Sequence, residues 1–269
     1  MSMLKNVTIG QYYPGDSVVH RLDPRTKLGL SVAFIVMLFV VKGFLPYVWL
    51  AALVLLVAQI ASVPLKVMMR GLKPLTFIIG LTFLLHVFTT RGGVTLWQLG
   101  FLRIDSHGLA QGAFLSIRLI MLVVATSLLT LTTSPIALTD GLEHILSPGA
   151  KLGLPAHELA MMMTIALRFI PTLIDEADKI MRAQLARGAD FETGGLIKRA
   201  KNLLPLLVPL FVSAFRRADE LAMAMEARAY RGGKGRTRLK ELQYTSSDFW
   251  AYCLSGLAFV AAYYLGRWA

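Results

Sequence analysis

The sequence has little charge and almost no cysteine, and both shortages limit what the chain can be. Only 16% of its 269 residues are charged, against about 25% in an ordinary soluble domain, while 55% are hydrophobic. A soluble fold cannot hide that much apolar surface, so we expect an integral membrane protein. The single cysteine, Cys253, excludes a disulfide within the chain and any cysteine-based metal cluster.

Known catalytic motifs are missing from the sequence as well. No G-x-x-x-x-G-K-[ST] phosphate loop, H-E-x-x-H metal motif or G-x-S-x-G nucleophile motif occurs. The glycine-rich run from Gly232 to Thr237 has the wrong spacing for a phosphate loop and follows a predicted helix rather than a strand. The histidines, at positions 20, 86, 107, 144 and 157, show no ligand spacing. We therefore expect no metal site and no enzyme, and the chain alone cannot hydrolyse ATP.

Apolar runs are what the sequence does contain, and they predict an all-α protein with about five transmembrane helices. The runs cover residues 28–41, 44–63, 74–90, 109–133 and 248–266. A helix needs about 20 residues to cross the hydrocarbon core. The first run is shorter, so we expect it to extend over neighbouring residues or to tilt in with the second. Lys42 and Gly43 leave room only for a hairpin between these two runs.

Basic residues set the predicted orientation. Residues 179–240 hold 14 of the 28 Lys and Arg and only five acidic residues, whereas the 91–108 loop holds two basic residues. The positive-inside rule then places the N-terminus and the long polar insert in the cytoplasm and the C-terminus outside. The predicted regions are a cytoplasmic segment 1–27, a four-helix membrane region 28–133, a cytoplasmic coupling-helix region 134–246 and a C-terminal membrane helix 247–269.

The polar insert is predicted to form two long amphipathic helices. Apolar residues recur at i, i+3 and i+4 through 156–187, with charged residues mostly on the other face. The second pattern covers 196–229, and a shorter helix is expected around 135–147. Pro171 should kink the first long helix.

Each long pattern ends in an arginine between small residues, and these triplets are the main candidate site. They are Ala186-Arg187-Gly188 and Ala227-Arg228-Ala229, with the two arginines 41 residues apart. A guanidinium at a helix end can make bidentate bonds inside a partner's groove, and small neighbours allow close approach. An ordinary helix terminus is the alternative, because arginine and glycine both favour that position.

The two triplets resemble the signatures of the transmembrane T component of energy-coupling-factor transporters. Three further segments are similar to that family in the same chain order: Pro14-Gly15-Asp16-Ser17 with His20 to Lys27, Thr132 to Pro135 with Asp140 to Glu143, and Arg168-Phe169-Ile170-Pro171-Thr172. The N-terminal segment is more similar to shared, vitamin-type T components than to cobalt-type ones. The second triplet departs from the pattern, because Ala229 stands where the family has glycine.

The resemblance implies a non-catalytic scaffold in the cell membrane of a prokaryote. It implies two ABC-type ATPase subunits as partners, docked at Arg187 and Arg228, with ATP and magnesium bound there and no cofactor in this chain. It also implies a membrane-embedded, substrate-binding S component, or several interchangeable ones, carried by the same long helices. The function implied is ATP-driven uptake of a vitamin or another micronutrient.

Methionines cluster in the insert and are candidates for the S-component contact. They are Met161, Met162, Met163, Met181, Met223 and Met225. Methionine makes surfaces that repack against different partners. Plain helix packing, or embedding in the membrane interface, explains the same residues.

Other polar residues near the apolar runs have structural interpretations. Asp23 and Pro24 suit the N-cap and first position of a helix, and a partner contact at Asp23-Pro24-Arg25 is the alternative. Arg118 interrupts the fourth run; we expect it to snorkel, with a contact inside the bundle as the alternative. His86 is expected to be a hydrogen-bonded packing residue.

Two rival functions follow from other features. An intramembrane enzyme acting on a lipid phosphate would need converging groups such as Asp140, Glu143 and His144, which show no recognised spacing. A tether for nucleic acid or anionic lipid would use residues 196–240, but their basic residues lack interleaved aromatics. We therefore expect no nucleic-acid partner.

Overall fold

Helices make up 80% of the structure, and there is almost no sheet. The computed structural model describes residues 12–99, 102–191, 195–232 and 241–268. Its helices are α1 (Val18–Arg21), α2 (Pro24–Val40), α3 (Phe44–Ile60), α4 (Leu65–Leu72), α5 (Thr76–Thr89), α6 (Ser106–Thr132), α7 (Pro135–Leu146), α8 (Ala156–Ala186), α9 (Leu196–Ala227) and α10 (Ser246–Trp268), with 3-10 turns at Lys73–Leu75 and Ser147–Leu152.

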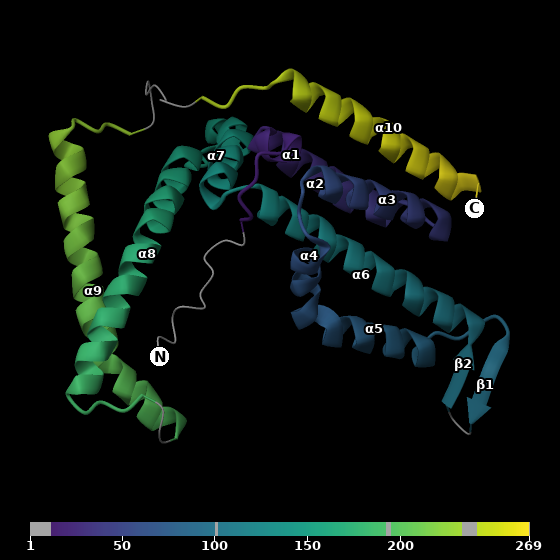
Figure 1. Cartoon of the computed structure of the whole chain (residues 1–269), viewed down its shortest axis with the longest axis horizontal. Helices are drawn as coiled ribbons and strands as arrows, with labels where there is room; N and C mark the ends of the chain where they lie inside the picture. Colours follow the sequence, from purple (N-terminus) through teal and green to yellow (C-terminus); the bar gives the residue numbers. More distant parts are fainter. Residues whose placement is uncertain (1–11, 100–101, 192–194, 233–240, 269) are drawn as a thin grey trace. The chain divides into compact units, whose positions relative to one another are not determined.

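Contacts divide the chain into two compact units. The membrane unit takes the described residues up to Gly141 and from Leu242 onward, and the insert unit takes those from Leu142 to Glu241. All the predicted apolar runs fall on helices of the membrane unit, namely α2, α3, α5, α6 and α10. Figure 1 shows α2, α3, α6 and α10 side by side, with α5 packed along α6. The predicted all-α membrane fold is therefore confirmed.

Apolar side chains on the outside of the membrane unit identify its solvent. Phe77 is 78% exposed and Leu257 71% exposed. In water, burying such surface would stabilise the fold by about 25 cal/mol per Å². By length and composition, four described helical stretches suffice to cross a membrane: Leu65–Thr89, Ser106–Thr132, Ala156–Ala186 and Ser246–Arg267; Phe44–Ile60 is a shorter apolar helix. The chain is thus a multi-pass membrane protein, and lipid covers this surface.

The interior of the membrane unit contains two buried apolar clusters, and four helices meet in the larger one. Leu38 of α2, Leu50 of α3 and Ala262 of α10 are fully buried, and Met121 of α6 packs with them. Within this cluster, the hydroxyl of Tyr47 donates to the carbonyl of Leu38. As the short connection predicted, α2 and α3 are joined by a tight turn, in which Gly43 has a positive φ of 92°.

A small hairpin joins α5 to α6, where the sequence indicated only a loop. Strand β1 (Thr95–Leu99) pairs antiparallel with β2 (Leu102–Asp105). Asp105 is 1% exposed, and its Oδ2 accepts the N–H of Gly92 at 2.9 Å. This bond closes the base of the hairpin against the start of α6. Strands of four or five residues leave too short an alternation to detect in the sequence.

The insert unit contains α8 and α9, which match the helices predicted for 156–187 and 196–229 almost to the residue. Helix α7, at Pro135–Leu146, matches the shorter helix predicted before them. Pro171 lies inside α8, where it removes one backbone donor. Helix α8 also has the length and composition of a span. Its placement in the cytoplasm rests on its amphipathic pattern and stays a prediction.

Helices α5 and α6 approach each other closely at Gly108. A Cβ at Gly108 would lie 2.7 Å from the carbonyl oxygen of Thr90 and 3.0 Å from those of His86 and Val87. Backbone atoms cannot move aside as a side chain can. Glycine therefore permits this approach, as small residues do between membrane helices generally.

We expect Gly108→Ala to destabilise the membrane unit by about 1–3 kcal/mol, because the new methyl group forces the two backbones apart. The measurement is the thermal unfolding midpoint of the purified chain in detergent. Gly80→Ala on α5 is the matched control, since a Cβ there meets nothing within 4 Å. Equal midpoints for the two variants would contradict the close-packing argument.

Candidate functional site

The first arginine triplet forms a Schellman cap at the end of α8. The N–H of Gly188 donates to the carbonyl of Leu185 at 3.0 Å, and the N–H of Ala189 donates to that of Gln184 at 2.9 Å. Gly188 adopts a positive φ of 86°. This is the left-handed residue that closes such a cap. Arg187, the residue before it, is exposed at the tip of the helix.

The second triplet closes α9 in the same way. The N–H of Ala229 donates to the carbonyl of Glu226 at 2.8 Å, and the N–H of Tyr230 donates to that of Met225 at 3.0 Å. Ala229 has a positive φ of 55°. It therefore occupies the left-handed position that Gly188 occupies in the first cap. Alanine at this position keeps the cap geometry and adds strain, since a side chain disfavours this conformation by roughly 1–2 kcal/mol.

All six residues of the two triplets are exposed. Each cap therefore presents a guanidinium beside small side chains on an accessible helix tip, and it does so twice in one unit. A planar, permanently charged group of this kind recognises carboxylates and carbonyls in pairs. The sequence predicted both the residues and their helix-end positions. Their role as a docking site stays a prediction.

Side-chain contacts hold α8 and α9 together. Arg217 of α9 forms an ion pair with Glu176 of α8, with Nη2 and Oε2 3.0 Å apart. Farther along, the side-chain amide of Gln184 donates to the carbonyl of Pro205 at 3.4 Å. Figure 1 shows the two helices crossing. The pair is therefore linked at two levels along its length.

The candidate methionines are divided between exposed and half-buried positions. Met162, Met163 and Met223 are exposed, and Met161, Met181 and Met225 are half-buried. Helix α9 adds an exposed apolar run: Leu203, Leu204, Leu207, Val208, Phe211, Val212 and Phe215. An apolar surface of this extent marks a place for a partner or for lipid.

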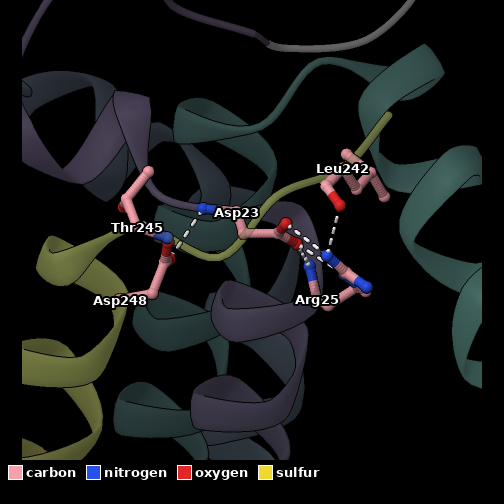
Figure 2. Close-up of polar contacts among 5 residues, drawn as sticks. All are labelled: Asp23, Arg25, Leu242, Thr245 and Asp248. Atoms are coloured by element: carbon pink, nitrogen blue, oxygen red, sulfur yellow. Dashed lines mark hydrogen bonds and ion pairs between the residues drawn. The ribbon is translucent and has the colours of Figure 1, made fainter. Parts of the chain in front are cut away.

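A polar cluster at one end of the membrane unit ties its N-terminal and C-terminal segments together (Figure 2). Asp23 Oδ1 accepts the N–H of Arg25 at 2.8 Å, which confirms the predicted N-cap of α2. The Arg25 guanidinium pairs with Asp23 Oδ2 at 2.9 Å and donates to the carbonyl of Leu242 at 3.0 Å. Its bond to Asp23 holds the pKa of Arg25 above its ordinary value.

Asp248 is the centre of this cluster, and the sequence analysis missed it. Its Oδ1 accepts the N–H of Asp23 at 2.8 Å, and its Oδ2 accepts the N–H and hydroxyl of Thr245. Nearby, the Lys27 ammonium donates to the carbonyls of His20 and Thr132, each at 2.9 Å. An acidic residue at the start of an apolar run was the available signal, because carboxylates are costly in membrane helices unless they are bonded.

Arg118 makes the contact inside the bundle that was the alternative to snorkelling. Its Nε donates to the hydroxyl of Tyr47 at 2.8 Å. Its guanidinium lies 5.1 Å from the ring centroid of Phe39 and 4.9 Å from that of Phe114. The hydroxyl and the two aromatic faces stabilise the charge of this half-buried side chain from within the unit.

The remaining titratable candidates have ordinary partners. His86 Nδ1 donates to the carbonyl of Thr82 at 2.8 Å, as expected of a packing residue. Glu143 pairs with His157, with Oε1 and Nδ1 2.9 Å apart. Among the residues that the structure describes, no group of three or more His, Cys, Asp or Glu side chains gathers where it could hold a metal ion.

Comparison with known proteins gives matches over nearly the whole chain. The profile of the CbiQ family, described as "Cobalt transport protein", matches residues 15–239. The protein named energy-coupling factor transporter transmembrane protein EcfT from Thermosediminibacter oceani is 58% identical over 259 residues, covering 96% of this chain and 97% of that protein. Proteins of the same name from Clostridium kluyveri and Bacillus subtilis are 54% and 51% identical, over 98% and 91% of this chain and 98% and 93% of their own lengths.

Relieving the strain at Ala229 should tighten the second cap. We expect Ala229→Gly to stabilise the cap by about 0.5–1 kcal/mol, because glycine adopts a positive φ without steric cost. Hydrogen exchange at the amide of Tyr230 should then slow about two- to fivefold. Gly188→Ala is the mirror-image control and should speed exchange at Ala189 by a similar factor. No change in either variant would show that the left-handed residues do not limit cap opening.

Removing the carboxylate of Asp248 should weaken the membrane unit. We expect Asp248→Ala to cost about 1–3 kcal/mol, because the buried N–H of Asp23 loses its acceptor. The thermal midpoint of the chain in detergent measures this loss. Asp16→Ala removes an exposed carboxylate from the same unit and should change stability by less than about 0.5 kcal/mol. A midpoint for Asp248→Ala equal to that of this control would contradict the central role of Asp248.

Proposed function

The chain belongs to the CbiQ family and is a membrane component of a transporter, and we propose that it is the energy-coupling T component of an importer. In this proposal it is a non-catalytic scaffold. It passes ATP-driven motion from two cytoplasmic ABC-type ATPase subunits to a membrane-embedded S component that binds the substrate. ATP and magnesium are bound in the ATPases and not in this chain.

The observation that carries the proposal is the presence of two equivalent, exposed arginine caps. Arg187 and Arg228 each occupy the same position in a Schellman cap, with the same backbone bonds around them. One chain therefore offers the same shape and charge at two places. A pair of similar ATPase subunits with similar grooves is the partner that such a duplicated surface fits.

The chemistry of the caps suits a groove lined by carboxylates or backbone carbonyls. A guanidinium donates two parallel hydrogen bonds to such groups, and the small residues on either side let the groove close around it. Removing one member of a desolvated, hydrogen-bonded charge pair costs about 2–5 kcal/mol in a complex. Two such contacts are enough to make assembly depend on them.

Motion reaches the membrane through the long helices in this proposal. Nucleotide binding draws the two ATPases together, and the arginine caps follow their grooves. Helices α8 and α9 act as levers, and the Glu176–Arg217 ion pair keeps them linked while their tips move. A two-helix lever that is bonded along its length transmits displacement better than separate helices, since neither can slide freely.

The S component would rest on the apolar surface of the insert unit. The exposed run on α9 includes Val208, Phe211 and Phe215, and Met162 and Met223 add adaptable side chains. A surface that can repack is suited to several interchangeable S components. Tilting of the levers would then tilt or release the S component and give alternating access.

The substrate in this proposal is a vitamin or another micronutrient, selected by the S component. The relatives named as energy-coupling factor transporter proteins support this class of importer. The distribution of basic residues supports an orientation in the prokaryotic cell membrane with the N-terminus and insert in the cytoplasm and the C-terminus outside.

Charge reversal at both caps should abolish assembly. We expect Arg187→Glu combined with Arg228→Glu to prevent copurification of the ATPase subunits when the natural complex is isolated through a tag on this chain. Each single substitution should weaken copurification without abolishing it, because the other cap still docks.

The matched control is Arg182→Glu combined with Arg216→Glu. It reverses the same number of exposed charges on the same two helices but away from the caps. This control should copurify the ATPases normally. Normal copurification by the cap double variant as well would falsify the docking role of the two arginines.

A further inference from the structure

Three side chains from three parts of the insert unit meet beside the second arginine cap. His157 lies in the first turn of α8, Glu143 in the last turn of α7, and Tyr230 directly after Ala229. His157 Nδ1 and Glu143 Oε1 are 2.9 Å apart, and the Tyr230 hydroxyl is 3.5 Å from His157 Nε2. The His157 and Glu143 side chains are 28% and 11% exposed.

The chemistry of imidazole explains how one residue can link the other two. Its two ring nitrogens point in different directions, and in the neutral ring one donates while the other accepts. An ionised carboxylate only accepts, so His157 Nδ1–H donates to Glu143. In the neutral ring Nε2 is then the acceptor, and the Tyr230 hydroxyl can donate to it. The arrangement satisfies all three groups at once.

Tyr230 connects this cluster to the cap itself. Its backbone N–H donates to the carbonyl of Met225, which is the outer bond of the Schellman cap around Arg228. Its side chain reaches His157. The first cap has a different support, in which the side-chain amide of Asn202 donates to the carbonyl of Asp190. The two arginine tips are thus alike in backbone and unlike in what holds them.

We propose that His157 is a positioning residue for the second arginine tip, fixing the cap around Arg228 through Tyr230 and linking it to α7 through Glu143. The positioning of the cap stands without the proposed function, and only its consequence for ATPase binding rests on that function. The pose of Arg228 is set by the start of α8 and the end of α7, so displacement of this tip reaches those helices directly. The Arg187 tip lies at the opposite end of α8 from His157.

Two conservative substitutions separate the two links. Asparagine places its amide near the position of Nδ1 and can keep the contact with Glu143, whereas glutamine reaches the position of Nε2 and can keep the contact with Tyr230. Hydrogen exchange in the purified full-length chain in detergent is the measurement. We expect His157→Ala, His157→Asn and Tyr230→Phe to speed exchange at the amides of Ala229 and Tyr230 about three- to tenfold, and His157→Gln to restore it.

The first cap is an internal control in the same sample. Exchange at the amides of Gly188 and Ala189 should stay at its wild-type rate in every variant, because that cap has the same backbone bonds but no contact with His157 in the described structure. Unchanged exchange at Ala229 and Tyr230, or equal acceleration at both caps, would overturn the inference. Tyr230→Phe removes a single oxygen atom and keeps the test valid if His157→Ala unfolds the unit.

A binding measurement then tests the consequence for docking of the second arginine cap. The affinity of the chain for the ATPase subunits purified from the natural complex should fall about three- to tenfold in His157→Ala and in Tyr230→Phe, and no further in the double variant. Multiplying losses in the double variant, or wild-type affinity in both single variants, would overturn the link between His157 and Arg228. Failure of the docking proposal itself would show in the charge-reversal variants and would leave the exchange result standing.

Discussion

A buried carboxylate joins the N-terminal and C-terminal segments of the membrane unit, which meet at one of its ends. Asp248 accepts the backbone N–H of Asp23 across 225 positions of sequence, and Asp23 in turn caps α2 and binds Arg25. Most of the surface around these helices is apolar and faces lipid, where an unpaired polar group has no water to bond. Buried polar groups at this end gain from a protein partner, and the bond between Asp248 and Asp23 joins the start of α10 to the start of α2.

The same requirement accounts for Arg118 and Lys27. Each is a cation in an apolar setting, and each is bonded inside the unit, Arg118 to a hydroxyl and two aromatic faces and Lys27 to two backbone carbonyls. The membrane unit is thus organised by a few buried polar contacts within a large apolar surface. The insert unit reverses this arrangement, because its polar groups are mostly exposed and its two helices end in open arginine caps.

The helices and the candidate site could be read from the sequence to an unusual extent. The boundaries of α8 and α9 were predicted within about two residues, because their apolar periodicity is long and each ends at a residue suited to a cap. The hairpin after α5 was not predicted, since its strands are too short to show a period. The network of Glu143, His157 and Tyr230 was not predicted either, because it joins residues up to 87 positions apart whose identities alone do not indicate contact.

The sequence by itself determined that this chain is a helical membrane protein, which long helices it forms, and where the two arginines lie on them. Those properties follow from local composition and periodicity. Only the tertiary structure decided that Ala229 takes the left-handed conformation of Gly188, that Arg118 binds within the bundle, and that Asp248 joins the two ends of the membrane unit. Each of these depends on groups far apart in the chain or on a backbone angle that the residue type disfavours. A local sequence pattern indicates neither distant contacts nor such an angle.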